Sequence, residues 1–138
     1  MKDKILSATA RANRFNHDGA TRQFMKQLSE GRFQGTRCLA CGHIPFPPRP
    51  FCPSCGHQEV QWIELPHEGT LYAFTQQSRS MRFSAPDVIG LVELQGIGLL
   101  LSRIDAKLDA LEIGQRVRVD FLELDERLTL HQFTPVKD

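Results

Sequence analysis

The sequence predicts a mainly β protein, in which a metal-binding ribbon is joined to a small β-barrel and preceded by one or more helices. Two observations lead to this prediction. Four cysteines stand as two Cys-x-x-Cys pairs, and the chain beyond Pro66 is a succession of strand patterns with little helical periodicity. We expect an N-terminal helical segment over residues 1–32, a zinc ribbon over 33–66 and a barrel over 67–138.

Composition excludes several classes of protein. Of the 138 residues, 41% are hydrophobic and 24% charged, which is ordinary globular usage and not that of a disordered chain. No apolar run approaches the roughly 20 residues that span a bilayer, and the start lacks the apolar core of a signal peptide. We therefore expect a cytoplasmic protein with no membrane segment. In that reducing compartment the paired cysteines indicate metal binding over disulfides.

Charge is distributed unevenly along the chain. Residues 1–37 hold eight Lys/Arg and three Asp/Glu, whereas residues 67–138 hold eight Lys/Arg and eleven Asp/Glu. The predicted barrel is therefore mildly acidic. A barrel that binds nucleic acid is expected to present a basic face, so this distribution argues against nucleic acid as the partner.

The first part of the chain contains two helical patterns. The stretch Lys4–Arg14 is rich in alanine and has no Gly or Pro, which is compatible with a short basic helix. A clearer helix starts near Asp18 or Thr21, has two apolar residues four apart on one face, and is expected to end at Gly31. It is either a packing helix that covers the ribbon or barrel, or a docking helix for a partner.

Five strand patterns follow Pro66. Alternation of Val and Phe with charged residues near position 119 is the period of a sheet with one buried face. Gln95-Gly96 is expected to form a tight hairpin turn, and most of the barrel aromatics, a group that includes Tyr72, are expected in the core. The predicted strands are Gly69–Gln77, Val88–Leu94, Ile97–Ile104, Gln115–Glu123 and Leu128–Phe133.

The two cysteine pairs lie in a repeated hexapeptide, Cys-x-x-Cys-Gly-His. Each pair turns tightly enough to direct two thiolates at one ion, and two pairs complete a tetrahedral set of sulfurs around Zn²⁺. The glycine after each pair suits a left-handed backbone conformation, which costs other residues free energy. The predicted ligands are Cys38, Cys41, Cys52 and Cys55.

Four thiolates fill the coordination sphere of zinc and leave no position for substrate, so we expect a structural ion and not a catalytic one. Iron in a rubredoxin-like site is the alternative, because the same sulfurs bind it. His43 and His57 adjoin the pairs and are interpreted as exposed neighbours. The chain has no recognisable catalytic motif, and for His131 we expect a cross-strand hydrogen bond instead of acid-base chemistry. We therefore do not expect an enzyme.

The polar loop between the first two barrel strands contains Arg79, Arg82 and Phe83. This mixture of cations and an aromatic ring suits a protein interface, or a phosphate-bearing ligand with an apolar arm. A solvated loop without a ligand explains it equally well.

Taken together, these residues resemble a family of zinc-ribbon proteins with an OB-fold barrel, long of unknown function and associated with acyl-CoA metabolism. The similarity runs from about Phe24 to Phe133. It is carried by the helix ending in Gly31, Cys38-x-x-Cys41-Gly, Phe46-Pro47-Pro48-Arg49, Cys52-Pro53-x-Cys55-Gly, Trp62, Gly69-Thr70-Leu71-Tyr72-x-Phe74-Thr75, Ala85-Pro86, Val92-Glu93-Leu94 with Gly96, and Ile113-Gly114-x-x-Val117.

The resemblance implies a five-stranded OB-fold and a non-catalytic accessory subunit. Its implied partners are thiolase-like enzymes, lipid-transfer-protein-type aldolases or MaoC-like enoyl-CoA hydratases, with CoA esters in contact in some complexes. Charge alone adds Arg103 to the loop residues Arg79, Arg82 and Phe83 as candidates to contact CoA phosphates or the partner. The alternative is an OB-fold that binds single-stranded nucleic acid, and self-association stays open.

Overall fold

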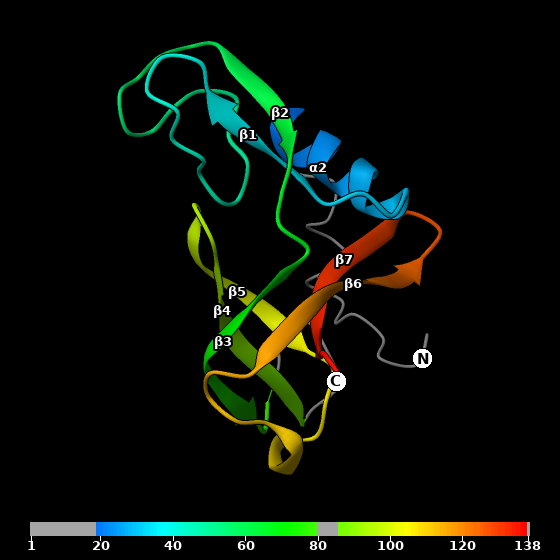
Figure 1. Ribbon diagram of the computed structural model, residues 1–138. Coiled ribbons are helices and arrows are strands. Elements are labelled where there is room, and N and C mark those ends of the chain that lie inside the picture. Colours follow the sequence, from blue (N-terminus) through cyan, green and yellow to red (C-terminus); the bar gives the residue numbers. More distant parts are fainter. Residues whose placement is uncertain (1–18, 80–85, 138) are drawn as a thin grey trace.

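The computed structural model describes residues 19–79 and 86–137. The helix expected over Lys4–Arg14 lies outside the described residues. The described chain forms one helix, a two-stranded ribbon and a closed five-stranded barrel (Figure 1). The predicted fold class is therefore confirmed. None of the helices in these two ranges is long and apolar enough to cross a membrane.

Helix α2 (Gly19–Ser29) lies at the junction of the ribbon and the barrel. Phe24 and Leu28, which stand four apart, share its buried face. The helix ends as predicted, because the Gly31 N–H donates to Leu28 O and the Arg32 N–H to Gln27 O, and these two bonds satisfy carbonyls at the helix end. α2 packs mainly on β7 (Leu128–Pro135), as a packing helix does.

The ribbon is a two-stranded antiparallel sheet of β1 (Gln34–Cys38) and β2 (Val60–Glu64). The chain between these strands forms the two cysteine loops, which project away from the barrel (Figure 1). Buried Thr36 accepts a hydrogen bond from the Arg49 N–H at 3.1 Å, which ties the proline-rich return loop to β1. This loop contains no helix, as its prolines predict.

The barrel closes in the order β3-β4-β5-β7-β6, with β3 also paired to β6. β5 and β7 run parallel, and the other neighbours are antiparallel. Each predicted strand is confirmed to within two residues at either end, and Gln95-Gly96 forms the β4–β5 turn. The strands are β3 (Glu68–Gln77), β4 (Asp87–Leu94), β5 (Gly98–Ile104), β6 (Arg116–Asp125) and β7, and the short helix η1 (Leu108–Ala110) links β5 to β6.

The core fills the barrel and continues into its junction with α2 and the ribbon. Phe33 and Phe133 are fully buried there, and the aliphatic residues of β3 to β6 pack around them. The expectation of core packing is wrong for Tyr72, which is 55% exposed. The register shifts between Leu71 and Ala73 at a β-bulge, and such a bulge turns a side chain out of the regular alternation.

An aromatic cluster joins the three parts of the molecule. The ring centroid of Phe46, from the proline-rich loop, lies 5.6 Å from that of Phe24 on α2 and 5.7 Å from that of His131 on β7. Phe33 completes the cluster at 6.1 Å from both Phe46 and His131. The pairs that Phe46 forms with Phe24 and His131 are edge-to-face, and the two pairs of Phe33 are tilted. Aromatic pairs of these geometries add to the free energy gained by burial, so the ribbon is packed against the barrel and not only tethered to it.

Candidate metal centre and interaction surfaces

The repeated hexapeptide folds into two loops with the same hydrogen bonds. The Gly42 N–H donates to Cys38 O at 3.0 Å, and the Gly56 N–H donates to Cys52 O at 2.9 Å. Both glycines have a positive φ, 79° and 81°, as the sequence predicts. The Cys41 N–H also points at Cys38 Sγ, 3.4 Å away. Each loop thereby turns its sulfurs toward the other loop.

The four sulfurs fit a tetrahedral ion. All lie within 4.8 Å of one another, and the Cys38–Cys55 and Cys41–Cys52 pairs are each 3.6 Å apart. A zinc–sulfur bond of 2.3 Å implies sulfur–sulfur separations of about 3.8 Å, whereas a disulfide needs about 2.05 Å. The structure therefore points to a structural metal held by the four predicted cysteines.

The thiols differ in their affinity for protons. The Cys41 N–H lowers the pKa of Cys38 to about 6, although burial raises it. For Cys55, the His57 N–H lowers the pKa, but the neighbouring Cys38 and Cys41 thiols together have the larger, opposite effect, and the pKa is raised to about 12. A metal ion that takes all four sulfurs must therefore displace protons, which is the usual behaviour of a thiolate site.

The histidines beside the site do not join it. The set of side chains that can hold a metal, among residues 19–79 and 86–137, consists of the four cysteines. His43 is exposed and His57 half-buried, and their carbonyls accept from the Cys38 and Cys52 N–H groups. The cross-strand hydrogen bond predicted for His131 is confirmed, because its Nδ1 lies 2.8 Å from Ser102 Oγ on β5.

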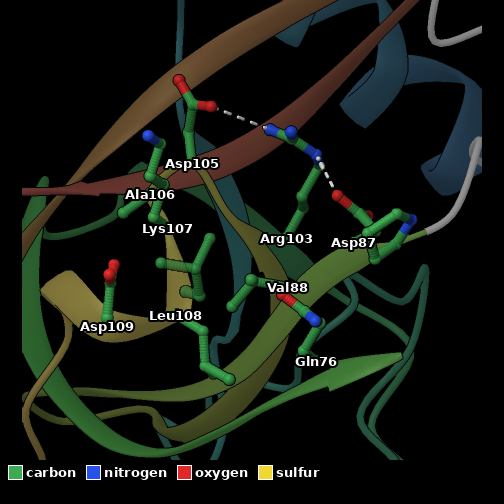
Figure 2. A pocket seen from close by; sticks show the side chains of 11 residues that line it. Gln76, Asp87, Val88, Arg103, Asp105, Ala106, Lys107, Leu108 and Asp109 are labelled. Carbon is green, nitrogen blue, oxygen red and sulfur yellow. Dashed lines mark hydrogen bonds and ion pairs between the residues drawn. The ribbon is translucent and has the colours of Figure 1, made fainter. Parts of the chain in front are cut away.

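Arg103, one of the residues proposed to contact CoA, lies in a buried polar network. Its Nε donates to Asp87 Oδ1 at 3.0 Å, and its Nη1 bonds to Gln132 and to Asp105. Gln132 in turn donates to Asp120 on β6. Figure 2 shows the guanidinium between Asp87 and Asp105. The network links four strands and holds Arg103 in a buried ion pair with Asp87.

A pocket of about 700 Å³ lies beside this network, between the start of β4, the end of β5 and η1 (Figure 2). Its charged lining consists of three carboxylates and two cations: Asp87, Asp105, Asp109, Arg103 and Lys107. This excess of negative charge does not favour an anionic phosphate.

Of the other predicted contact residues, Arg79 is not among those that line this pocket. Arg79 is described and exposed at the end of β3. Arg82 and Phe83 lie outside the described residues. Contact of Arg79, Arg82, Phe83 or Arg103 with CoA therefore stays a prediction.

A smaller cleft, of about 320 Å³, separates the ribbon from the barrel. Its ribbon wall is the loop around Phe46 and Pro47, and its barrel wall is Ile97 and Leu99. The outer face of β5 continues the apolar surface, with Leu99 45% and Leu101 62% exposed. In the sequence, Leu99 and Leu101 do not differ from other residues of an apolar strand, so this surface could not be predicted.

Two family models match successive parts of the chain. The family model for the rubredoxin-like zinc ribbon domain of ChsH2 matches residues 25–61. The model for the C-terminal OB-fold domain of ChsH2 matches residues 62–122.

Two relatives and one solved structure are similar to the chain. A DUF35 domain-containing scaffold protein of Methanocaldococcus jannaschii is 31% identical over 97 residues, 67% of this chain and 69% of that protein. A probable enoyl-CoA hydratase alpha subunit of Thermomonospora curvata is 36% identical over 102 residues, 72% of this chain; the chain spans only 32% of that relative's length. A structure of the Ltp2-ChsH2(DUF35) aldolase aligns with a TM-score of 0.75 and 30% identity, over 86% of this chain and 96% of the other.

The fold and the four-cysteine site define a rubredoxin-like zinc ribbon joined to an OB-fold barrel. The chain belongs to the DUF35 family. The resemblance stated from the sequence is therefore confirmed. Relatives of the chain are named as scaffold proteins, as a hydratase subunit and as part of an aldolase.

Proposed function

We propose that the protein is a non-catalytic accessory subunit that assembles with an acyl-CoA-processing enzyme. The observation that carries the proposal is the alignment over 96% of the ChsH2(DUF35) chain of an aldolase. A relative named as a scaffold protein adds support. The candidate partners are an aldolase or a hydratase, after the relatives, and a thiolase-like enzyme, after the family resemblance.

The metal proposed for the site is Zn²⁺. Four sulfur ligands leave it no open position, so it stabilises the two loops and activates no substrate. Iron binds the same ligand set, and metal analysis of gently purified protein distinguishes the two. One zinc per chain is the expected result, and one iron, with the visible absorbance of an iron–thiolate site, would contradict the assignment.

The subunit role is tested by affinity purification of the tagged full-length chain from its native host. We expect an acyl-CoA enzyme subunit to elute in fixed stoichiometry, and size-exclusion chromatography to show one complex. The Cys38→Ala variant, purified in the same way, tests whether a folded ribbon is required for binding to the partner. Recovery of the wild-type chain alone, monodisperse at its own mass of 15.7 kDa, would contradict the proposal.

A further inference from the structure

One edge of β5 has little strand pairing in the described part of the chain. β5 pairs with β4 from Gly98 to Arg103. On its other side, among the residues that the structure describes, it pairs with β7 only through Arg103 and Ile104. Within the described residues, the backbone of residues 98–102 therefore has no strand partner on that side, although the Ser102 side chain bonds across it to His131 of β7. A strand edge of this kind presents backbone donors and acceptors to any extended chain that can reach it.

This edge lacks the usual protection. Its sequence is Gly-Leu-Leu-Leu-Ser, with no charge and no proline, although charged residues, prolines and bulges are the common means of preventing edge pairing. β3 differs, because it has a bulge after Leu71 and its Leu71 backbone is bonded to Gly114 and Gln115. An uncharged, leucine-rich edge in a folded protein indicates a surface that is covered in its working state.

The cleft limits what can cover the edge. The ribbon loop stands over the gap between β5 and β7, since Phe46 contacts His131 of β7 and lines the cleft opposite Leu99 of β5. Figure 1 shows this loop close above the β4–β5 turn. A cleft of about 320 Å³ admits one extended segment but not a folded domain. The described residues that line the cleft are mainly apolar, with Arg49 and His43 as the exceptions that can carry a charge, so we expect the segment to be mainly apolar.

We propose that β5 and the cleft bind one extended, mainly apolar segment of the partner enzyme subunit, which adds a strand to β5. Its backbone pairs with residues 98–102, and its alternate side chains pack on Leu99, Leu101 and the ribbon loop. This inference rests on the proposed function, because the segment belongs to the acyl-CoA enzyme. It adds the surface and the mode of binding.

The experiment compares two exposed apolar residues in the tagged full-length chain. Leu101→Glu places a charge on the edge strand, and Ile113→Glu places one at a 73% exposed position in the β5–β6 connection. Both variants keep the core, so their melting temperature and metal content should equal those of the wild type. We expect Leu101→Glu to retain at least tenfold less partner subunit, and Ile113→Glu to retain the wild-type amount.

Hydrogen exchange of the purified complex tests the strand addition directly. Amides of residues 98–102 and of the ribbon loop should exchange at least tenfold more slowly in the complex than in the free chain, while those of residues 108–115 keep their rates. Unchanged exchange at 98–102, equal partner retention by both variants, or protection in a complex that contains only copies of this chain would overturn the inference. In each case partner binding by the wild type would leave the proposed function standing. Failure of the wild type to bind any acyl-CoA enzyme would overturn both.

Discussion

The ribbon has two five-residue strands and buries few apolar side chains of its own, whereas the barrel has five longer strands around a continuous aliphatic core. Each Å² of apolar surface that is buried contributes about 25 cal/mol to stability. The core of the barrel buries enough apolar surface to fold on this basis, whereas a two-stranded sheet buries little and is only marginally stable in water. The two regions therefore differ in what stabilises them: metal coordination in the ribbon and hydrophobic burial in the barrel. The aromatic cluster connects them.

Loss of a metal ligand is expected to have the largest effect, and to unfold the ribbon without unfolding the barrel. Cys38→Ala removes a ligand whose ion contributes, in small metal-folded modules, about 10 kcal/mol. We expect loss of bound metal and fast hydrogen exchange over residues 34–64, with β4, β6 and β7 still protected. Ser54→Ala, an exposed non-ligand in the second loop, is the control and should keep the metal. Loss of protection throughout the barrel would show that the two regions do not differ as described.

The next effect tests the connection between the regions. Phe33 is fully buried and its ring meets those of Phe46, His131 and Phe133. Phe33→Ala should lower the free energy of unfolding in urea by about 3–5 kcal/mol, the usual cost of deleting a buried aromatic ring, with metal content unchanged. Phe51→Ala, at a 37% exposed ring, serves as control with a much smaller loss. Equal losses of unfolding free energy in the two variants would contradict a stabilising role for the aromatic cluster.

Within the barrel, the buried ion pair is the next test. Arg103→Met leaves the Asp87 carboxylate, 1% exposed, without its guanidinium, which should cost about 3 kcal/mol of unfolding free energy. The double variant Arg103→Met/Asp87→Leu removes both charges and should recover most of that loss in the same urea titration. The exposed pair Arg116–Glu68 is the matched control, and Arg116→Met should cost about 1 kcal/mol or less. A double variant no more stable than Arg103→Met would rule out the uncompensated charge as the cause.

The smallest effect concerns a close backbone approach. A Cβ at Gly69 would lie 2.5 Å from Glu93 O, where β3 meets β4. Gly69→Ala should therefore lower the free energy of unfolding by about 1–3 kcal/mol, as overpacking does. At Gly19 a Cβ meets nothing within 4 Å, so Gly19→Ala in α2 should be neutral or stabilising by thermal melting. A destabilised Gly19→Ala would remove steric clash as the explanation of the difference.

Local patterns in the sequence were sufficient to predict the strands and the metal site. The alternation that contains Val117 and Val119 predicts a buried face, and both residues are buried. The Cys-x-x-Cys-Gly repeat predicts the loop around each pair of sulfurs, and the two loops have the same hydrogen bonds. Both signals lie within a few residues, so no tertiary knowledge is needed to interpret them.

Features that depend on contacts between distant residues could not be predicted. Alternation along β5 places Arg103 on the same outer face as Leu101, and only the neighbouring strands supply Asp87 and Gln132, which bury it. The aromatic cluster joins Phe24, Phe46 and His131 across more than a hundred residues. The length of the β5 edge without a strand partner depends on the residue at which pairing between β5 and β7 begins. The sequence of β5 does not determine that residue by itself.

The proposed role, an accessory subunit and not an enzyme, can be tested by adding the chain back to its partner. The measurement is acyl-CoA turnover by the purified partner subunit alone, by the purified chain alone, and by the two together. We expect no turnover by the chain alone and a rise of at least tenfold in the partner's activity when one equivalent of the chain is added. Turnover by the chain alone at the rate of the complex would contradict the account, and so would a partner whose activity is indifferent to the chain.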